Sequence, residues 1–325
     1  MRWKYLETYL RQALVGPLVP GAADVRIVTP AGTGQPGAYW GQRGMWDPEM
    51  LHHTLPLAYN ECISGRNDVV LVSPDNQSLV GTMLTWAKNM THLIGMGPSD
   101  MMLGQRARLG HATTIATFMT LSGYGNLFAN FGINYGVANT DLCALDITGA
   151  RNTLKNMRVV PTYATAMDSA SFALIKINNT EITFKNCVIG TDATLMSAGA
   201  LISFPTAGVA PRVIFDNCLL IMRADATAPL FFKTAAGLGE GYIILKNTQC
   251  LNIGSSALAY AIDGAGLGNC KIMLDSNSFF GGCTEVVAVA NEASVMLAPA
   301  NMAINQVNTA SVALFNGLAV NPDVS

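Results

Sequence analysis

A short segment centred on asparagine recurs along the middle of the chain. Its copies are LFANFGIN (127–134), TLKNMRVV (153–160), TFKNCVIG (183–190), IFDNCLLI (214–221), ILKNTQCL (244–251) and MLDSNSFF (273–280). The central residues are Asn130, Asn156, Asn186, Asn217, Asn247 and, in the last copy, Ser276. From Asn156 onward the intervals are 30, 31, 30 and 29 residues, and Asn130 precedes Asn156 by 26. Such a period predicts a stack of equivalent units, each of which contacts only its neighbours.

Apolar positions within each copy predict two short strands joined near the asparagine. One apolar residue stands two places before the asparagine, and another stands three places after it. The first set is Leu154, Phe184, Phe215, Leu245 and Leu274, and the second is Val159, Ile189, Leu220, Cys250 and Phe279. Alternate residues of a strand share a face, so the odd step between the sets predicts a bend. Asparagine suits a bend because its side chain can bond to nearby backbone.

A second series of apolar segments recurs at nearly the same interval, between 27 and 30 residues. It occupies residues 144–150, 173–180, 200–207, 229–236 and 259–266. These segments are rich in Val, Ile, Phe and Thr and lack a helical period, which excludes a helical solenoid. The Leu-x-x-Leu-x-Leu pattern of a leucine-rich repeat is also absent. The predicted fold is therefore an all-β parallel β-helix, a solenoid of coils of about 30 residues.

Stacking gives the recurring polar positions a structural role. Equivalent residues of adjacent coils lie about 4.8 Å apart, so the asparagines are expected to form an internal ladder of amides. The residues one place earlier should form an outward column of charges: Lys155, Lys185, Asp216, Lys246 and Asp275. We interpret this column as a solvated ladder of opposite charges, each pair contributing about 0–1 kcal/mol. The alternative is a lyase centre at Asp216 between Lys185 and Lys246.

The two ends of the chain differ from the repeats. Residues 3–15 predict an amphipathic helix, and a Gly/Pro-rich arm follows from residue 28. The expected division is an attachment segment at 1–44, a capping helix at 45–66, the β-helix at 67–305 and a tail at 306–325. The tryptophans all fall within the first 86 residues, which favours a contact surface at the N-terminal end. The candidate attachment residues are Trp3, Leu6, Leu10, Leu14, Trp40 and Trp46.

Composition excludes several classes of function. Charged residues make up 12% of the 325 residues, about half the usual share, and the formal charge is −2. A nucleic-acid binder would carry a basic surplus, so no nucleic-acid partner is expected. Neither a membrane span nor a secretion signal is expected, because no long uninterrupted apolar run occurs. Low charge on a long solenoid predicts that one lateral face is buried against identical copies.

Cysteines and histidines do not predict a metal site or a cofactor. The 7 cysteines lack CxxC or CxxH spacing, and we expect free, buried thiols, with Cys187 and Cys218 stacked on successive coils. All 4 histidines precede the regular copies, so none is expected to act as a base on the face of a regular coil. His52 and His53 fall in the expected capping helix.

The first coils carry a resemblance to a known family. The stretch ISGRNDVVLVSPDNQSLVGTMLTWAKNMTHLIGMG (63–97) is similar to the opening of right-handed β-helix proteins encoded by tailed bacteriophages. There, a helix ending in a small-residue turn leads to an Asp-Val-Val strand, a Pro, and a coil that runs from Trp to Ile-Gly-x-Gly. The resemblance extends over residues 45–300 and implies a right-handed, pectate-lyase-like helix and association as trimers. The family includes capsid decoration proteins, tail fibres and tailspike depolymerases.

Resemblance to carbohydrate-cleaving β-helices covers only one short motif. Polygalacturonase-like enzymes combine four motifs, and only Asn-Thr-Asp occurs here, at Asn139, Thr140 and Asp141. Hydrolysis needs a second carboxylate at a set distance, so we expect no catalysis by Asp141. The predicted function is a non-enzymatic virion protein, a trimeric decoration or cement protein on a capsid, made in the host cytoplasm. Its partners would be its own copies and a major capsid or other virion protein, bound through the N-terminal arm. A tailspike or fibre that binds or cleaves host polysaccharide is the alternative.

Overall fold

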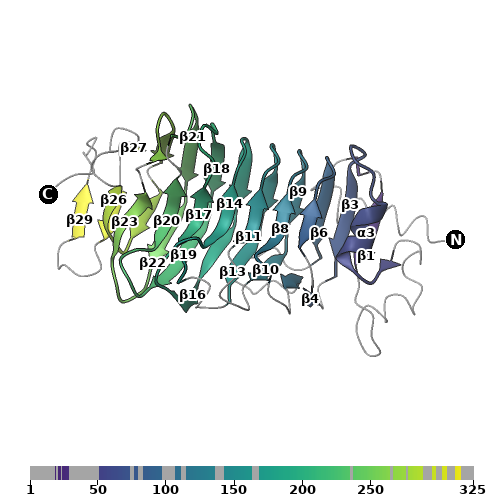
Figure 1. Ribbon diagram of the computed structural model, residues 1–325, viewed down its shortest axis with the longest axis horizontal. Coiled ribbons are helices and arrows are strands. Elements are labelled where there is room, and N and C mark those ends of the chain that lie inside the picture. The colour runs from purple at the N-terminus through teal and green to yellow at the C-terminus, as the bar shows by residue number, and fades with distance from the viewer. Residues whose placement is uncertain are drawn as a thin grey trace.

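The computed structural model describes residues 19, 21–22, 24–28, 51–73, 77–79, 83–96, 107–110, 115–135, 143–162, 168–234, 237–263, 266–275, 277–287, 295–297, 302–305 and 312–315. Three long sheets wind around one axis and produce an elongated rod that runs from β1 (Val25–Val28) and α3 (Leu55–Glu61) at one end to β29 (Val312–Phe315) at the other (Figure 1). Strands that are neighbours within a sheet come from successive coils and run parallel, with one antiparallel pair at the C-terminal end. The predicted parallel β-helix is therefore confirmed.

The sheets differ in length and are named here A, B and C. Sheet A contains, in spatial order, β2 (Leu51–His52), β1 (Val25–Val28), β3 (Asp68–Val72), β6 (Thr91–Gly95), β9 (Leu127–Ala129), β12 (Thr153–Lys155), β15 (Ile182–Lys185), β18 (Arg212–Asp216), β21 (Tyr242–Lys246), β24 (Lys271–Leu274) and β27 (Val295–Leu297). Sheet B contains β4 (Gln77–Leu79), β7 (Arg108–Gly110), β10 (Gly132–Tyr135), β13 (Arg158–Pro161), β16 (Val188–Met196), β19 (Leu219–Ala224), β22 (Gln249–Asn252), β25 (Phe279–Gly281), β28 (Met302–Asn305) and β29 (Val312–Phe315). Sheet C contains β5 (Leu84–Trp86), β8 (Thr117–Leu121), β11 (Cys143–Ile147), β14 (Ala173–Ile177), β17 (Ala200–Phe204), β20 (Leu230–Thr234), β23 (Leu258–Asp263) and β26 (Cys283–Val287).

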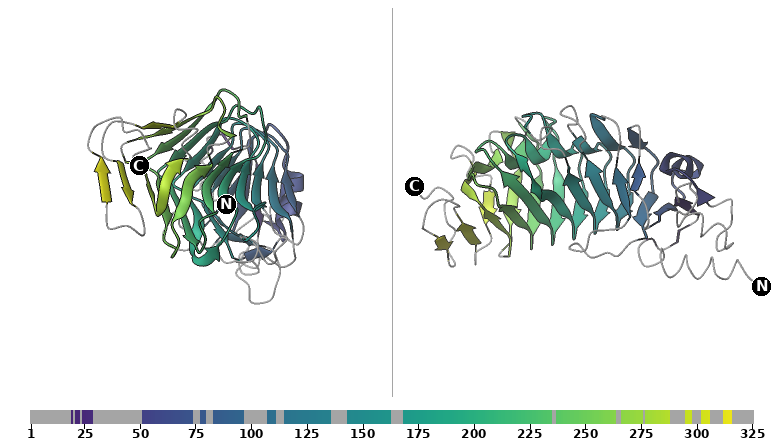
Figure 2. Two further views of the ribbon diagram at one scale, coloured as in Figure 1. Left: turned by 60° about the vertical axis from the view of Figure 1, so that its left-hand side comes forward. Right: turned by 90° about the horizontal axis from the view of Figure 1, so that it is seen from below.

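Each regular coil takes one strand from every sheet, in the order C, A, B. The coil β14–β15–β16 shows how the sequence copies map onto it: the asparagine segment supplies β15 and β16, and the second series supplies β14. Register aligns the inward residues, so Leu154 pairs with Phe184 and Phe184 with Phe215. Figure 2 shows the stacked strands from two further directions.

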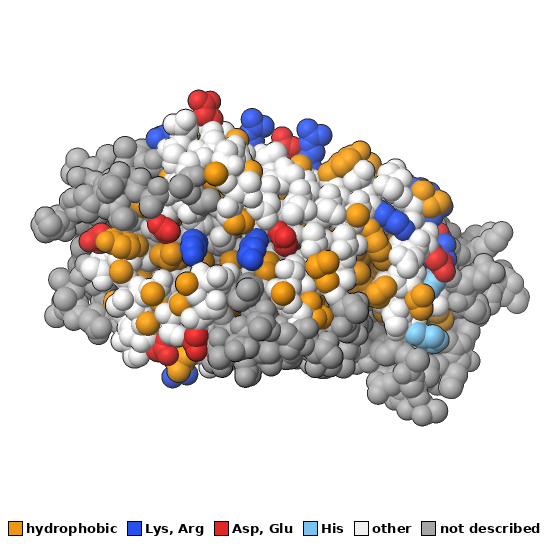
Figure 3. Space-filling view, viewed as in Figure 1, with side chains coloured by type: hydrophobic (Ala, Val, Ile, Leu, Met, Phe, Trp, Pro, Cys, Tyr) orange, Lys and Arg blue, Asp and Glu red, His pale blue; other side chains and the backbone are white. Residues whose placement is uncertain are grey.

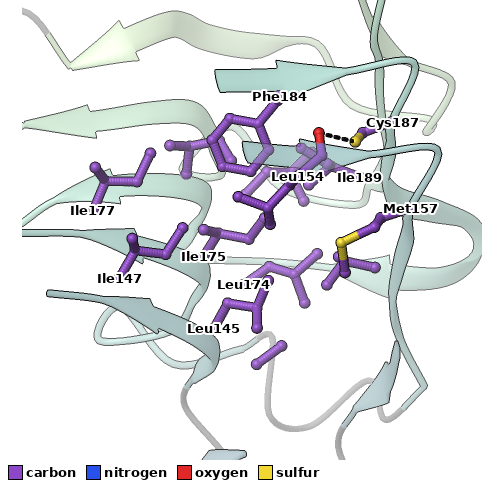
Figure 4. Packing of buried hydrophobic residues seen from close by; sticks show 14 of the residues in the cluster. Leu145, Ile147, Leu154, Met157, Leu174, Ile175, Ile177, Phe184, Cys187 and Ile189 are labelled. Carbon is purple, nitrogen blue, oxygen red and sulfur yellow. Dashed lines mark hydrogen bonds between the residues drawn. The ribbon is translucent and has the colours of Figure 1, made fainter. Parts of the chain in front are cut away.

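The interior is one continuous apolar cluster that runs along the rod. Figure 4 shows part of it, with Leu154 and Phe184 of sheet A and Ile189 of sheet B pointing toward the interior. The rings of Phe184 and Phe215 stack with centroids 4.7 Å apart and an interplanar angle of 7°. Burial of such side chains between coils supplies most of the free energy that holds neighbouring coils together.

The last copy of the asparagine segment contains one residue more than the others. Leu274 pairs with Leu245, but after the turn Phe279 pairs with Gln249 and Phe280 with Cys250. The predicted inward residue Phe279 is therefore wrong, and Phe280 takes the inward position. An extra residue in a turn shifts the following strand by one and exchanges its two faces.

The described part of the N-terminal end contains one short helix. Helix α3 spans Leu55–Glu61, and Thr54 caps it by accepting the Leu57 N–H at 3.4 Å. Leu55, Ala58 and Tyr59 of α3 belong to the interior cluster. Strand β2 precedes α3, so His52 lies in a strand and not in the predicted capping helix. Residues 45–50 of that predicted helix lie outside the described residues.

Strand β1 lies within the predicted attachment segment and joins sheet A between β2 and β3. A second apolar cluster, distinct from the interior one, contains Val25 and Ile27 of β1 with Val69 and Leu71 of β3. Val25 pairs with Val69 and Ile27 with Leu71, which places both pairs in columns of sheet A. At the other end, β29 forms a strand within the predicted tail. Among the described residues, no helix is long and apolar enough to cross a membrane.

Candidate functional site

The recurring asparagines lie at the turn from sheet A to sheet B and form a ladder of amides. Nδ2 of each asparagine donates to Oδ1 of the asparagine one coil earlier. The distances are 2.9 Å for Asn156 to Asn130, 3.1 Å for Asn186 to Asn156, 2.9 Å for Asn217 to Asn186 and 3.0 Å for Asn247 to Asn217. All five adopt a left-handed backbone, with φ between 49° and 62°. Asparagine meets both requirements, because it tolerates positive φ and carries both a donor and an acceptor. The ladder is buried at Asn156, half-buried at Asn130 and Asn186, and exposed at Asn217 and Asn247, so the prediction of an internal ladder is wrong toward its C-terminal end.

An internal column of donors follows the ladder one residue later. Sγ of Cys187 donates to the Leu154 carbonyl at 3.4 Å, drawn as the dashed line in Figure 4. The hydroxyl of Thr248 donates to the Phe215 carbonyl at 3.0 Å, one coil earlier. Cys218 and Ser278 make equivalent bonds at their own levels. The thiols are free and buried, and they replace hydroxyl groups as weak internal donors.

Other internal amides carry no repeating sequence signal and were not predicted. Asn152 accepts the Asn126 N–H at 3.0 Å, and Asn126 accepts the Thr91 N–H at 2.8 Å, all at the turn from sheet C to sheet A. Asn252 bonds to the Gly282 carbonyl at 2.9 Å across coils. Only the internal hydrogen bonds identify these residues, because single asparagines in Gly/Ser-rich turns have no distinctive pattern.

The predicted charge column lies on the outer face of sheet A. Register pairs Lys155 with Lys185, Lys185 with Asp216 and Asp216 with Lys246. One ion pair forms, with Lys185 Nζ 3.6 Å from Asp216 Oδ2, and both side chains are partly exposed. Such a pair contributes about 0–1 kcal/mol. The carboxylate of Asp216 therefore faces lysine neighbours, as in the solvated ladder expected from the sequence.

Asp275 differs from the other members of that column. Its carboxylate turns back and accepts N–H groups of Asn247 at 3.0 Å and Asn277 at 3.2 Å, and the Ser278 hydroxyl at 2.7 Å. The extra residue of this turn removes the backbone carbonyl that would otherwise meet Asn247. The prediction of an outward charge at Asp275 is corrected for that reason.

Sheet C carries an outward row that the sequence did not single out. Register aligns Asp146, Lys176, Ser203, Lys233 and Asp263 on successive coils. Asn178 Nδ2 donates to Asp146 at 2.6 Å, and Lys233 Nζ donates to the Ala170 carbonyl at 2.9 Å. Elsewhere charges are sparse, and the face shown in Figure 3 is mostly uncharged. The row is therefore a polar strip along one side of the rod.

Exposed apolar side chains gather near the N-terminal end and form what we call the N-terminal patch: Leu57, Ile63, Met90 and Tyr124. They are between 36% and 53% exposed. Three of them lie on successive turns, which hydrogen bonds tie together: the Gly65 N–H to the Asn89 carbonyl at 2.8 Å, and the Met90 N–H to the Tyr124 carbonyl at 2.9 Å.

The predicted attachment residues Trp3, Leu6, Leu10, Leu14, Trp40 and Trp46 lie outside the described residues, as does the Asn139–Thr140–Asp141 motif.

One histidine of the first coils, His92, is buried. His92 is in β6, with Nδ1 accepting the Leu127 N–H at 3.0 Å and Nε2 3.3 Å from Asn67 Oδ1. Burial lowers the pKa of His92 to about 4. The ring is therefore neutral at pH 7, with its proton on Nε2. Among the described residues, no group of three His, Cys, Asp or Glu side chains could hold a metal ion.

Comparison with known proteins identifies the fold. No protein-family model matches the chain, and curated protein sequences give no match. Among solved structures, the Aspergillus niger pectin methylesterase is 11% identical, with a TM-score of 0.51 over 88% of this chain and 85% of that one. A mutant pectin methylesterase in complex with a hexasaccharide is 14% identical, with a TM-score of 0.51 over 90% and 85%. Pectate lyase Pel9A is 10% identical, with a TM-score of 0.50 over 83% and 78%.

These likenesses define the class: a right-handed parallel β-helix of the pectate-lyase-like type. At such low identity they concern the fold alone.

Proposed function

We propose that the chain is a structural protein of a tailed-phage virion, a trimeric decoration protein that attaches to the capsid by its N-terminal end. The observation that carries the proposal is the N-terminal patch. Exposed apolar groups that cluster on a surface mark contact sites, and three of these four lie on successive hydrogen-bonded turns at one end of a rod with few charges. A rod that binds by one end and projects the other is suited to decorate a particle.

The outer face of sheet A supports lateral association of copies. Ile214, Ile244 and Met273 form a half-buried apolar column, because register pairs Ile214 with Ile244 and Ile244 with Met273. Charged residues flank this column on both sides. One flank contains Lys185 and Asp216, and the other contains Arg212, which lies 3.5 Å from Glu181. An apolar strip between complementary charges resembles the centre and rim of a protein interface.

Two measurements test the proposal. Light scattering after size exclusion should give three times the chain mass, 34.4 kDa. Quantitative mass spectrometry of purified particles should find the chain at a fixed copy number per capsid. A monomer in solution contradicts the trimer, and absence from intact particles contradicts the virion role.

A second function is favoured by the polar strip on sheet C. Two acidic and two basic side chains lie along this strip from Asp146 to Asp263, and such groups are able to bond sugar hydroxyl groups along an extended chain. Pectin methylesterases and a pectate lyase share the fold. On this hypothesis the protein binds or cleaves host surface polysaccharide. It predicts clearing of a polysaccharide-containing lawn, lost in Asp146→Ala with Lys176→Ala. Unchanged clearing in the double variant contradicts a role for the strip.

A further inference from the structure

The outer face of sheet A is apolar over its first five strands, and we call the apolar side chains there the outer cluster. Val69 and Leu71 of this cluster alternate along β3 with Val70 and Val72, which belong to the interior cluster, so the two sets face opposite ways. Register aligns one column of the outer cluster across the five strands: Leu51, Ile27, Leu71, Ile94 and Ala129. The apolar column ends at β12, where Lys155 pairs with Ala129.

The outer cluster is buried although it lies on the outside of the rod. Val69 is 0% exposed, Leu71 is 2% exposed and Ile94 is 3% exposed. Farther along the same face, the side chain of Lys185 is 50% exposed and Ile214 is only half-buried. Outward residues on the open face of a sheet keep part of their surface in water. A further layer of protein therefore covers the outer cluster.

The chain just before β1 contributes to that layer. Val19 is 5% exposed and belongs to the outer cluster, and Ala22 packs against the cluster. The Ala22 N–H donates to the Val19 carbonyl at 3.3 Å, in the turn that leads into β1. The side chains of Val19 and Ala22 are too small to cover five strands. We therefore expect residues that precede Val19 to lie on the same face.

Residues 3–15 match the outer cluster in pattern and in length. Their apolar side chains Trp3, Leu6, Leu10 and Leu14 fall on one stripe of a helix. A helix over these residues is about 20 Å long at about 1.5 Å per residue, and five strands about 4.8 Å apart span about 19 Å. The short link from residue 15 to Val19 reaches at most about 14 Å, which keeps the helix close to the cluster.

We propose that residues 3–15 form an amphipathic helix that packs on the outer cluster of its own chain, with the stripe from Trp3 to Leu14 against sheet A. The proposal gives a role within the rod to side chains that the sequence predicted as attachment residues. It is independent of the virion role, because the N-terminal patch consists of other residues. A helix in this position closes the first part of the outer face of sheet A and leaves the column from Ile214 to Met273 for contacts between copies.

The test is photo-crosslinking in the full chain, with the photoreactive amino acid p-benzoylphenylalanine in place of Leu10. After illumination, digestion and mass spectrometry should find position 10 joined to residues of β1, β3, β6 or β9. A crosslink within one chain leaves the mass at 34.4 kDa in denaturing electrophoresis, and a crosslink between two copies doubles it. We expect the crosslinked product at the mass of one chain.

Gln12 lies on the opposite side of the predicted helix and provides the matched control. The same photoreactive group at position 12 should give on the order of tenfold fewer crosslinks to these strands. Position 6 gives a second reading if the chain substituted at position 10 does not fold, as judged by circular dichroism. Crosslinks at twice the chain mass assign the outer cluster to a second copy and overturn the proposal. Equal yields from positions 10 and 12, or no crosslinks to these strands from positions 6 and 10, overturn it as well.

Discussion

Both carboxylate oxygens of Asp275 accept the backbone N–H of Asn247, each at 3.0 Å. Lower in the stack, the corresponding N–H groups of Asn186 and Asn217 donate to backbone carbonyls of the next coil, at 2.9 Å each. At the end of the amide ladder, a side-chain carboxylate therefore replaces the backbone carbonyl as the acceptor of the asparagine N–H. The extra residue in this turn removes the regular partner, and Asp275 replaces it.

Removal of that carboxylate should weaken the C-terminal coils. We expect Asp275→Ala to lower the free energy of unfolding by about 1–3 kcal/mol, since bonds to a charged acceptor are among the stronger ones. Asp275→Asn keeps an acceptor oxygen and should lose less. Urea unfolding followed by circular dichroism measures both. Equal losses in the two variants contradict the role of the carboxylate as an acceptor.

Substitutions at Asn186 separate the two properties that asparagine contributes to the ladder, its amide hydrogen bonds and its tolerance of a left-handed backbone. Asn186→Ala loses two amide bonds, about 0.5–1.5 kcal/mol each, and places a side chain at a φ of 53°. Left-handed backbone costs a residue such as alanine about 1–2 kcal/mol more. Asn186→Gly loses the same bonds without that strain. Thermal unfolding should rank wild type above the glycine variant and the glycine variant above the alanine variant. An alanine variant as stable as the glycine variant contradicts the backbone argument.

Position 218 tests the column of thiol and hydroxyl donors. Thr248 occupies the equivalent place one coil later, and its hydroxyl lies 3.0 Å from the carbonyl oxygens of both Phe215 and Lys246, to which it can donate. Cys218→Thr should therefore keep the stability of the wild type within about 1 kcal/mol, because the hydroxyl replaces the thiol as donor. Cys218→Val has the shape of threonine without the donor and should lose about 1–3 kcal/mol more. Urea unfolding midpoints of the two variants measure this difference. A valine variant as stable as the threonine variant contradicts a stabilising role for a hydrogen-bond donor at position 218.

His92 should make stability depend on pH. Its folded pKa is about 4, below the ordinary 6.5 of the unfolded chain, so only the unfolded chain takes up a proton in between. Stability should fall as pH drops from about 6.5 to about 4, by on the order of 3 kcal/mol, and His92 should have no such effect above pH 7. Urea midpoints across this range measure the slope. His92→Gln should make the slope shallower without abolishing it, because burial also lowers the pKa of His52. A slope unchanged in His92→Gln contradicts this account.

The N-terminal patch can be changed without disturbing the core, because its side chains point outward. The double variant Met90→Ser with Tyr124→Ser should fold with wild-type stability and lose most of its binding to particles that lack the protein. Tyr260, exposed at the other end of the rod, gives the matched control Tyr260→Ser, which should bind normally. Co-sedimentation with particles measures both. Normal binding by the patch variant contradicts attachment through this end.

The sequence predicts the structural features that recur in every coil, and it does not predict those that occur at a single place in the stack. The asparagine spacing was enough to identify the coils, the inward residues from Leu154 to Leu220 and the outward lysines, because each depends on the same local pattern in every copy. The extra residue before Phe280 breaks that pattern and shifted the prediction by one. The burial of His92 and the position of β1 depend on register between coils, which spacing alone does not define. The N-terminal patch depends on which apolar residues remain uncovered, and this is decided only when the coils stack.

Electron microscopy of purified phage particles, with a gold label on the C-terminal end of the chain, tests the central proposal most directly. Attachment by the N-terminal patch predicts labels in groups of three on the capsid surface, each held away from the shell by the length of the rod. Labels at the tail tip, or particles without label, would contradict the decoration role.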